Sequence, residues 1–109
     1  MTQPALADFP RIGRRPRLAA AVVEDLVRAI VTEAYPAGSA LPPEAALGRT
    51  YQVSRTVIRE ATVAVAQKGL VVSQQGRGTI VREADAWDML DPVVLGLSLI
   101  HISEPTRPY

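Results

Sequence analysis

Hydrophobic residues recur at helical spacing in the first third of the chain. The stripe comprises Leu18, Val22, Leu26 and Ile30, with Val23, Val27 and Val31 beside them. Because residues three and four apart share one face of a helix, this spacing predicts an amphipathic helix. Pro16 suits the first turn of that helix, and Pro36 disfavours helical geometry at the residue before it. We therefore expect a first helix from Pro16 to Tyr35.

Two further helices are predicted in the middle of the chain. Pro43 stands where a helix can begin, and Glu44 to Tyr51 indicates a short helix that buries Leu47 and Tyr51. After a tight connection at residues 52–53, Ser54 is a good N-cap for a third helix that runs to about Lys68. Gly69 fits the position just after that helix, where a left-handed backbone ends it.

The hydrophobic period then changes from that of a helix to the alternation of a strand. Leu70 to Gln74 and Thr79 to Val81 are strand-like, and the glycine-punctuated segment 75–78 between them suits a hairpin tip. A short helix and a longer helix joined by a tight turn, followed by a hairpin, are typical of a winged helix-turn-helix. The predicted fold class is therefore α+β, with three helices and a two-stranded β-hairpin wing.

The third predicted helix has an apolar face and a basic face. Ile58, Ala61 and Val65 should face the core, whereas Arg55, Thr56 and Arg59 share another face near the helix start. Arginine can grip the O6 and N7 atoms of guanine, and threonine can meet a phosphate or a thymine methyl. The N-cap residue Ser54 leaves the positive end of the helix free for a phosphate. An ordinary amphipathic helix with a solvated basic face would show the same pattern.

Four segments occur in one order with short gaps, and together they are highly specific: LPPEAAL (41–47), VSRTVIRE (53–60), KGLV (68–71) and QGRGTIV (75–81). Over residues 16–82 the chain resembles the GntR family of bacterial regulators, in particular its FadR-type branch. The resemblance implies that Ser54, Arg55, Thr56 and Arg59 approach bases and phosphates, and that Gln75, Gly76 and Arg77 reach the minor groove from the wing. The family usually has an arginine where this chain has Ala45, and Arg49, one turn later, is a candidate replacement.

The resemblance also implies partners. They are double-stranded operator DNA, a second copy of the full-length protein in a homodimer, and a small-molecule effector, such as a sugar acid or another organic acid. The effector would bind only a further domain that this chain lacks. A repressor is the most common role in the family. The alternative is a winged helix used for protein–protein contacts, which would not need the basic face of Arg55 and Arg59.

Charge divides the chain unevenly although its formal net charge is +1. From Arg11 to Arg82 there are ten arginines and Lys68 against five acidic residues, which gives +6. From Glu83 to Glu104 there are five acidic residues and no arginine or lysine. Such asymmetry is expected of a basic segment that faces a polyanion, followed by a different part, although chance clustering on a solvated surface gives the same count.

These patterns divide the chain into four parts. We expect residues 1–15 to be a disordered basic arm, residues 16–82 to form the winged helix, and residues 83–96 to be a linker and the start of a truncated effector-binding domain. Asp91-Pro92 is a plausible helix start in this linker. Its apolar residues either begin that domain or dock back onto the winged helix: Trp87, Leu90, Val94 and Leu95.

The last part, residues 97–109, includes the stretch LSLIHISEPTR, which matches the one-frame translation of a transposase-type sequencing-library adaptor. We expect this tail to be an appended artefact that packs against nothing specific.

Composition argues against several other classes of protein. The chain has no cysteine, and its single histidine, His101, lies in the suspect tail, so a catalytic base and a metal-ligand cluster are both unsupported. We therefore expect neither an enzyme nor a cofactor. No apolar run is long enough to span a bilayer, and the N-terminus lacks a signal-peptide core, so we expect a soluble, cytoplasmic protein.

Overall fold

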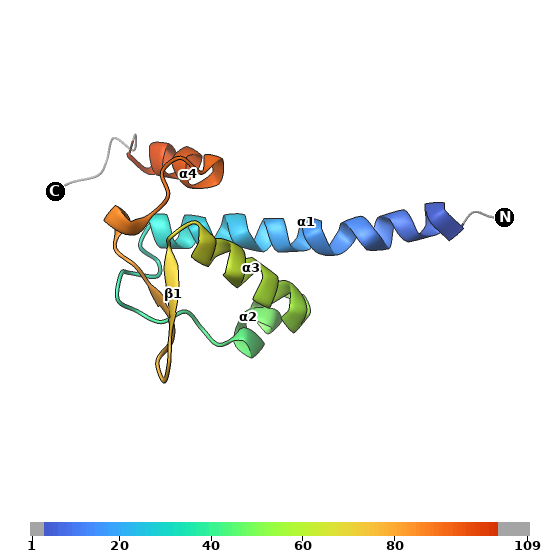
Figure 1. The fold of residues 1–109 in the computed structure, drawn as a ribbon, viewed down its shortest axis with the longest axis horizontal. Helices are drawn as coiled ribbons and strands as arrows, with labels where there is room; N and C mark the ends of the chain where they lie inside the picture. Colours follow the sequence, from blue (N-terminus) through green and yellow to red (C-terminus); the bar gives the residue numbers. More distant parts are fainter. Residues whose placement is uncertain (1–3, 103–109) are drawn as a thin grey trace.

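The computed structural model describes residues 4–102 of the chain. The order of its elements is α1 (Pro4–Val31), α2 (Glu44–Tyr51), α3 (Arg55–Gln67), β1 (Val71–Gln74), β2 (Gly78–Val81), the short 3-10 helix η1 (Ala84–Ala86) and α4 (Pro92–Ile102). Helix α1 forms a long rod, with α2, α3 and the hairpin on one side and α4 on the opposite side (Figure 1). The predicted α+β winged helix-turn-helix is therefore confirmed, with α4 in addition.

Helix α1 differs from its prediction at both ends. It begins at Pro4 rather than Pro16, so the expectation of a disordered arm is wrong for residues 4–15, while residues 1–3 lie outside the described part. Extending an existing helix avoids the free-energy cost of a new nucleus, and this gain outweighs the low helix propensity of Pro10 and Gly13. The helix ends at Val31 because Glu33 adopts a left-handed backbone with φ of 67°, several residues before Pro36.

The turn between α2 and α3 forms as the sequence predicts. Gln52 adopts a left-handed backbone with φ of 58°, and the Val53 amide donates to the Gly48 carbonyl across 3.1 Å. The Tyr51 hydroxyl donates to Asp25 Oδ2 across 2.6 Å, which ties α2 to α1. Burial, with this hydrogen bond and the nearby carboxylate, raises the pKa of Tyr51 above its ordinary value.

The two hairpin strands pair antiparallel, from Val71 opposite Val81 to Gln74 opposite Gly78. The segment that follows α1 adds a partner to β2 that the sequence did not predict. The Leu41 amide donates to the Thr79 carbonyl across 2.8 Å, and the Val81 amide donates to the Ser39 carbonyl across the same distance. These bonds anchor the base of the wing to the segment that leads into α2.

One hydrophobic core joins α1, α3 and the hairpin. Ile58, Ala61 and Val65 of α3 are fully buried, as predicted, and they face the apolar stripe of α1. The buried part of that stripe comprises Val22, Val23, Leu26, Val27, Ile30 and Val31. Residues Leu41, Leu47, Leu70, Val71 and Val81 complete the core from the other elements. The core therefore fixes α3 and the hairpin relative to one another.

Helix α4 starts where the sequence predicts. Asp91 Oδ1 accepts hydrogen bonds from the amides of Val93 at 2.9 Å and Val94 at 3.3 Å, which caps the helix. Val94 is fully buried and Trp87 packs against the core, so the alternative of docking back holds for these two residues. It does not hold for Leu90, which is 91% exposed.

The expectation that the tail packs against nothing is wrong for its first two residues. Leu97 packs half-buried against the core and Ser98 is buried, because both lie on the face of α4 that meets α1. Among the described residues, the Ser98 hydroxyl has no hydrogen-bond partner. Residues 103–109 of the expected tail lie outside the described part. Within residues 4–102, no helix is long and apolar enough to cross a membrane.

Candidate nucleic-acid interface

The start of α3 presents a row of polar and basic side chains to solvent. Ser54 caps the helix, as predicted, because its Oγ accepts a hydrogen bond from the Val57 amide at 3.2 Å. Arg55 and Thr56 in the first turn are exposed, and Arg59 follows one turn later, also exposed. The cap leaves the other amides of the first turn free to face an anion. This end of α3 is therefore suited to contact with phosphates and base edges.

Arg59 is exposed but already engaged by an acidic residue of α2. Its Nε donates to Glu44 Oε2 at 3.4 Å and its Nη2 donates to Glu44 Oε1 at 3.2 Å, which forms a side-on pair. The hydrogen bond to Glu44 and its negative charge raise the pKa of Arg59 above its ordinary value. The pair links the start of α2 to the first half of α3.

The wing tip has two glycines with open space around the position of a side chain. Gly76 and Gly78 have φ of 82° and 89°, and no atom lies within 4 Å of the position that a Cβ would occupy at either residue. Gln75 and Arg77 are exposed, and Arg77 Nη1 donates to Gln74 Oε1 at 3.0 Å. A tip with left-handed glycines lets its backbone approach a groove closely.

The fold brings the α3 start and the wing tip to one side of the molecule. Both project from α1 away from α4 (Figure 1). A hollow lies between the segment that leads into α2, the middle of α3 and the wing, and it is bordered by Glu44, Thr62 and Arg77 among others. A second hollow shares Glu44 and Thr62 with the first and is also bordered by Arg59 of α3 and Ser73 of β1. The two predicted groups of residues, Ser54, Arg55, Thr56 and Arg59 on α3 and Gln75, Gly76 and Arg77 on the wing, thus form a single surface.

Arg49 extends this surface on α2. It is exposed in the last turn of α2, and within the described part of the chain neither Arg49 nor Arg55 forms an ion pair. Ala45, at the position where the resemblance implies an arginine, is exposed as well. Arg49 and Arg55 therefore keep their charges available for an anionic partner.

Sequence reasoning missed the acidic residues that neighbour these arginines. Glu44 is distant from Arg59 along the chain, so only the folded corner of α2 and α3 brings them together. Glu60 likewise pairs with Arg15 of α1, with Glu60 Oε2 at 3.4 Å from Arg15 Nε. The acidic first residue of α2 was the one available signal, because an acid is favourable at a helix start. Among the described residues, no group of acids and histidines could hold a metal ion.

The three helices, the tight turn and the exposed wing define a winged helix-turn-helix domain of the kind that binds DNA. The family model of the bacterial regulatory proteins of the gntR family matches residues 18–81. The chain therefore belongs to the GntR family of bacterial transcription regulators.

Relatives place the chain close to FadR-type members of this family. It is 33% identical over 85 residues to the HTH-type transcriptional regulator YieP of Escherichia coli, covering 78% of this chain and 37% of that protein. It is 36% identical over 74 residues to the galactonate operon transcriptional repressor of Escherichia coli, covering 68% of this chain and 32% of that protein. It is 35% identical over 77 residues to the fatty acid metabolism regulator protein of Haemophilus influenzae, covering 71% of this chain and 31% of that protein. The chain thus spans about a third of the length of these relatives.

A solved structure agrees with this assignment. The chain matches a GntR protein of Streptococcus agalactiae with a TM-score of 0.55 and 29% identity, covering 62% of this chain and 32% of that one. These relatives are transcription regulators rather than enzymes.

Proposed function

We propose that this chain binds operator DNA sequence-specifically and acts as the DNA-binding part of a transcriptional repressor. The observation that carries the proposal is the single surface formed by the basic start of α3 and the open wing tip. In this arrangement α3 enters the major groove, where Arg55 and Arg59 read base edges, and Thr56 and the Ser54 end of the helix meet phosphates. Gly76 and Arg77 follow the adjacent minor groove.

Regulation in the proposed scheme lies outside the winged helix. We infer that the full-length protein is a homodimer that binds paired half-sites, with a small organic acid as effector on a further domain. Two linked winged helices gain affinity because the second contact becomes intramolecular. Support for repression comes from the galactonate operon transcriptional repressor among the relatives. A change in the relative orientation of the two winged helices would then alter their fit to the operator.

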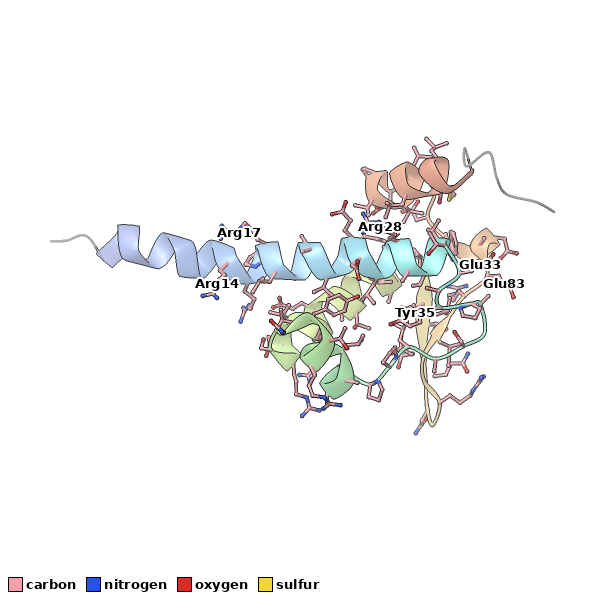
Figure 2. All side chains as sticks on the ribbon, turned by 180° about the vertical axis from the view of Figure 1, so that it is seen from behind. Arg14, Arg17, Arg28, Glu33, Tyr35 and Glu83 are labelled. Atoms are coloured by element: carbon pink, nitrogen blue, oxygen red, sulfur yellow. The ribbon has the colours of Figure 1, made fainter. Side chains whose placement is uncertain are left out.

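The test needs a DNA sequence that the chain itself chooses. Repeated selection of this chain on random duplexes yields a preferred duplex, and fluorescence anisotropy compares it with a scrambled one. We expect Arg55→Ala to weaken binding to the preferred duplex by about 1–3 kcal/mol and to weaken binding to the scrambled duplex less. Arg28→Ala removes the same charge from α1, in the part of the helix beside α4 (Figure 2), and should leave the preference unchanged.

Two results would contradict the proposal. If selection enriches no sequence, the winged helix does not read DNA, and its role as a protein–protein module becomes the better hypothesis. If Arg55→Ala weakens both duplexes equally and slightly, Arg55 only holds phosphates and carries no sequence information.

A further inference from the structure

Glu44 is an acidic residue in the middle of a surface that otherwise suits a polyanion. It stands at the first position of α2 and borders the hollow between α3 and the wing. It is the one acidic residue among those that border the hollow, which Arg77 of the wing also borders. A carboxylate at this place repels phosphates and therefore lowers general affinity for DNA. Its presence in this surface calls for another role.

The geometry of the Glu44–Arg59 pair leaves the reading edge of Arg59 free. A guanidinium has five N–H groups, and Glu44 accepts from Nε and from one side of Nη2. The N–H groups of Nη1 and the outer N–H of Nη2 point away from this side-on contact. These end-on groups are the ones that form a two-bond contact with guanine O6 and N7. Arg59 can thus hold Glu44 and a base edge at the same time.

Holding the side chain also reduces the conformational entropy that Arg59 loses when it binds DNA. A free arginine side chain samples many rotamers, and fixing them on binding opposes the gain from a base contact. Both partners of the pair are partly exposed, with 64% of the Arg59 side chain and 36% of the Glu44 side chain accessible. The pair exists in the structure of the chain alone, and the exposed part of the guanidinium remains within reach of DNA.

We propose that Glu44 is a positioning residue that sets the base preference of Arg59, in an inference that rests on the proposed DNA-binding function. Glu44 aligns the guanidinium for guanine and, through its charge, discourages Arg59 from sliding onto a phosphate. Its removal should strengthen binding to DNA of any sequence and weaken discrimination at the base pair that Arg59 reads. Glu44 would thus trade general affinity for selectivity.

The matched control lies on the same helix as Arg59. Glu60 also pairs with an arginine, but with Arg15 of α1 rather than with Arg59. Glu60→Gln and Glu44→Gln therefore remove the same negative charge and one ion pair each, and only Glu44→Gln releases Arg59. A difference between the two variants reports the positioning of Arg59 rather than the change in net charge. Circular dichroism melts of both variants monitor the fold.

The experiment selects random duplexes with the wild-type chain, Arg59→Ala, Glu44→Gln and Glu60→Gln, and compares their base preferences. Arg59→Ala identifies the base pair that Arg59 reads. At that base pair we expect the preference for guanine to fall about tenfold in Arg59→Ala and about fivefold in Glu44→Gln, and to be retained in Glu60→Gln. In the Arg59→Ala background, adding Glu44→Gln should change the preference no further.

The outcomes separate the inference from the proposed function. If the wild-type chain selects no sequence, the proposed function fails first. If it selects a sequence and Glu44→Gln keeps the full preference at the Arg59 base pair, the positioning role is overturned. A Glu44→Gln effect at a different base pair, or an effect that persists without Arg59, also overturns it, because Glu44 would then contact DNA itself. Loss of the preference through unfolding would appear in the melts, and Glu44→Asp, which keeps the charge but shortens the reach, must then lose the preference in a folded chain.

Discussion

At the scale of single residues, two glycines with left-handed backbone have different surroundings. Gly69 has φ of 85°, and a Cβ there would lie 2.3 Å from the Ala86 carbonyl oxygen. Gly76 has φ of 82°, and a Cβ there would meet no atom within 4 Å. From the sequence, Gly69 was predicted to end a helix with a left-handed backbone, and Gly76 was predicted to lie in a hairpin tip. It could not predict the close approach at Gly69, because Ala86 belongs to a segment that folds back from beyond the wing.

This difference leads to opposite expectations for the same substitution. Gly69→Ala should lower the free energy of unfolding by about 3 kcal/mol or more, because strain at positive φ and a backbone clash add together. Gly76→Ala should cost only about 1 kcal/mol, since strain alone acts, and should mainly weaken DNA binding by stiffening the wing tip. Chemical denaturation of both variants measures the two costs. Equal costs would mean that the segment after β2 does not press on Gly69.

At the scale of elements, a mostly buried ion pair joins the end of α3 to the start of α4. Lys68 Nζ lies 2.6 Å from Asp91 Oδ2, and the Asp88 amide donates to the Lys68 carbonyl across 2.7 Å. Burial by itself raises the pKa of Asp91, but the hydrogen bonds from Lys68 and from the Val94 and Val93 amides outweigh it, so the pKa lies below its ordinary value. The helix start at Asp91-Pro92 was predictable, whereas the partner Lys68 was not, because the pair depends on how α4 docks.

Asp91 should make the free energy of unfolding depend on pH in the acidic range. A lowered pKa means that its contribution is present above the unfolded-state value of about 3.9 and is lost as the pH falls through the lower value in the folded chain. Asp91→Asn keeps a capping oxygen but loses the charge, so we expect about 1–2 kcal/mol less stability at neutral pH and a flatter decline below about pH 4. Asp88→Asn is the control, since Asp88 caps a turn by accepting from the Leu90 amide at 3.0 Å without a lysine partner. Identical pH profiles of thermal melting for the two variants would contradict the role of the ion pair.

At the scale of the whole molecule, the basic surface and α4 lie on opposite sides of α1. Arg49, Arg55, Arg59 and Arg77 belong to α2, α3 and the wing, while the acidic segment that follows Arg82 leads to α4. The sequence indicated this division through its uneven charge, and the order of elements gave the fold. The pairing of Arg59 with Glu44 was beyond it, because long-range packing brings the two residues together. The length of α1 was beyond it for a local reason, because helix extension continues through Pro10 and Gly13, which disfavour a helix.

The number of arginines on this surface sets the expected salt dependence of DNA binding. Each neutralised phosphate releases counterions and contributes about −0.9 to the slope of log affinity against log salt. With Arg55 and Arg59 on base edges, phosphate contacts by the other two arginines, Arg49 and Arg77, should give a slope of about −1.8. Arg77→Ala should make it shallower by about 0.9. Anisotropy titrations across salt concentrations measure it, and affinity that does not change with salt would exclude this arginine surface as the contact.

The most direct measurement is a nuclear magnetic resonance titration of the isotope-labelled chain with its selected duplex. It reports every backbone amide at once, so it separates the basic surface from the rest of the molecule. We expect the largest shift changes at the amides of residues 54–59 and 75–77, with the amides of α4 almost unchanged. Changes concentrated on α4, with the start of α3 and the wing tip unaffected, would contradict the assignment of this surface to DNA.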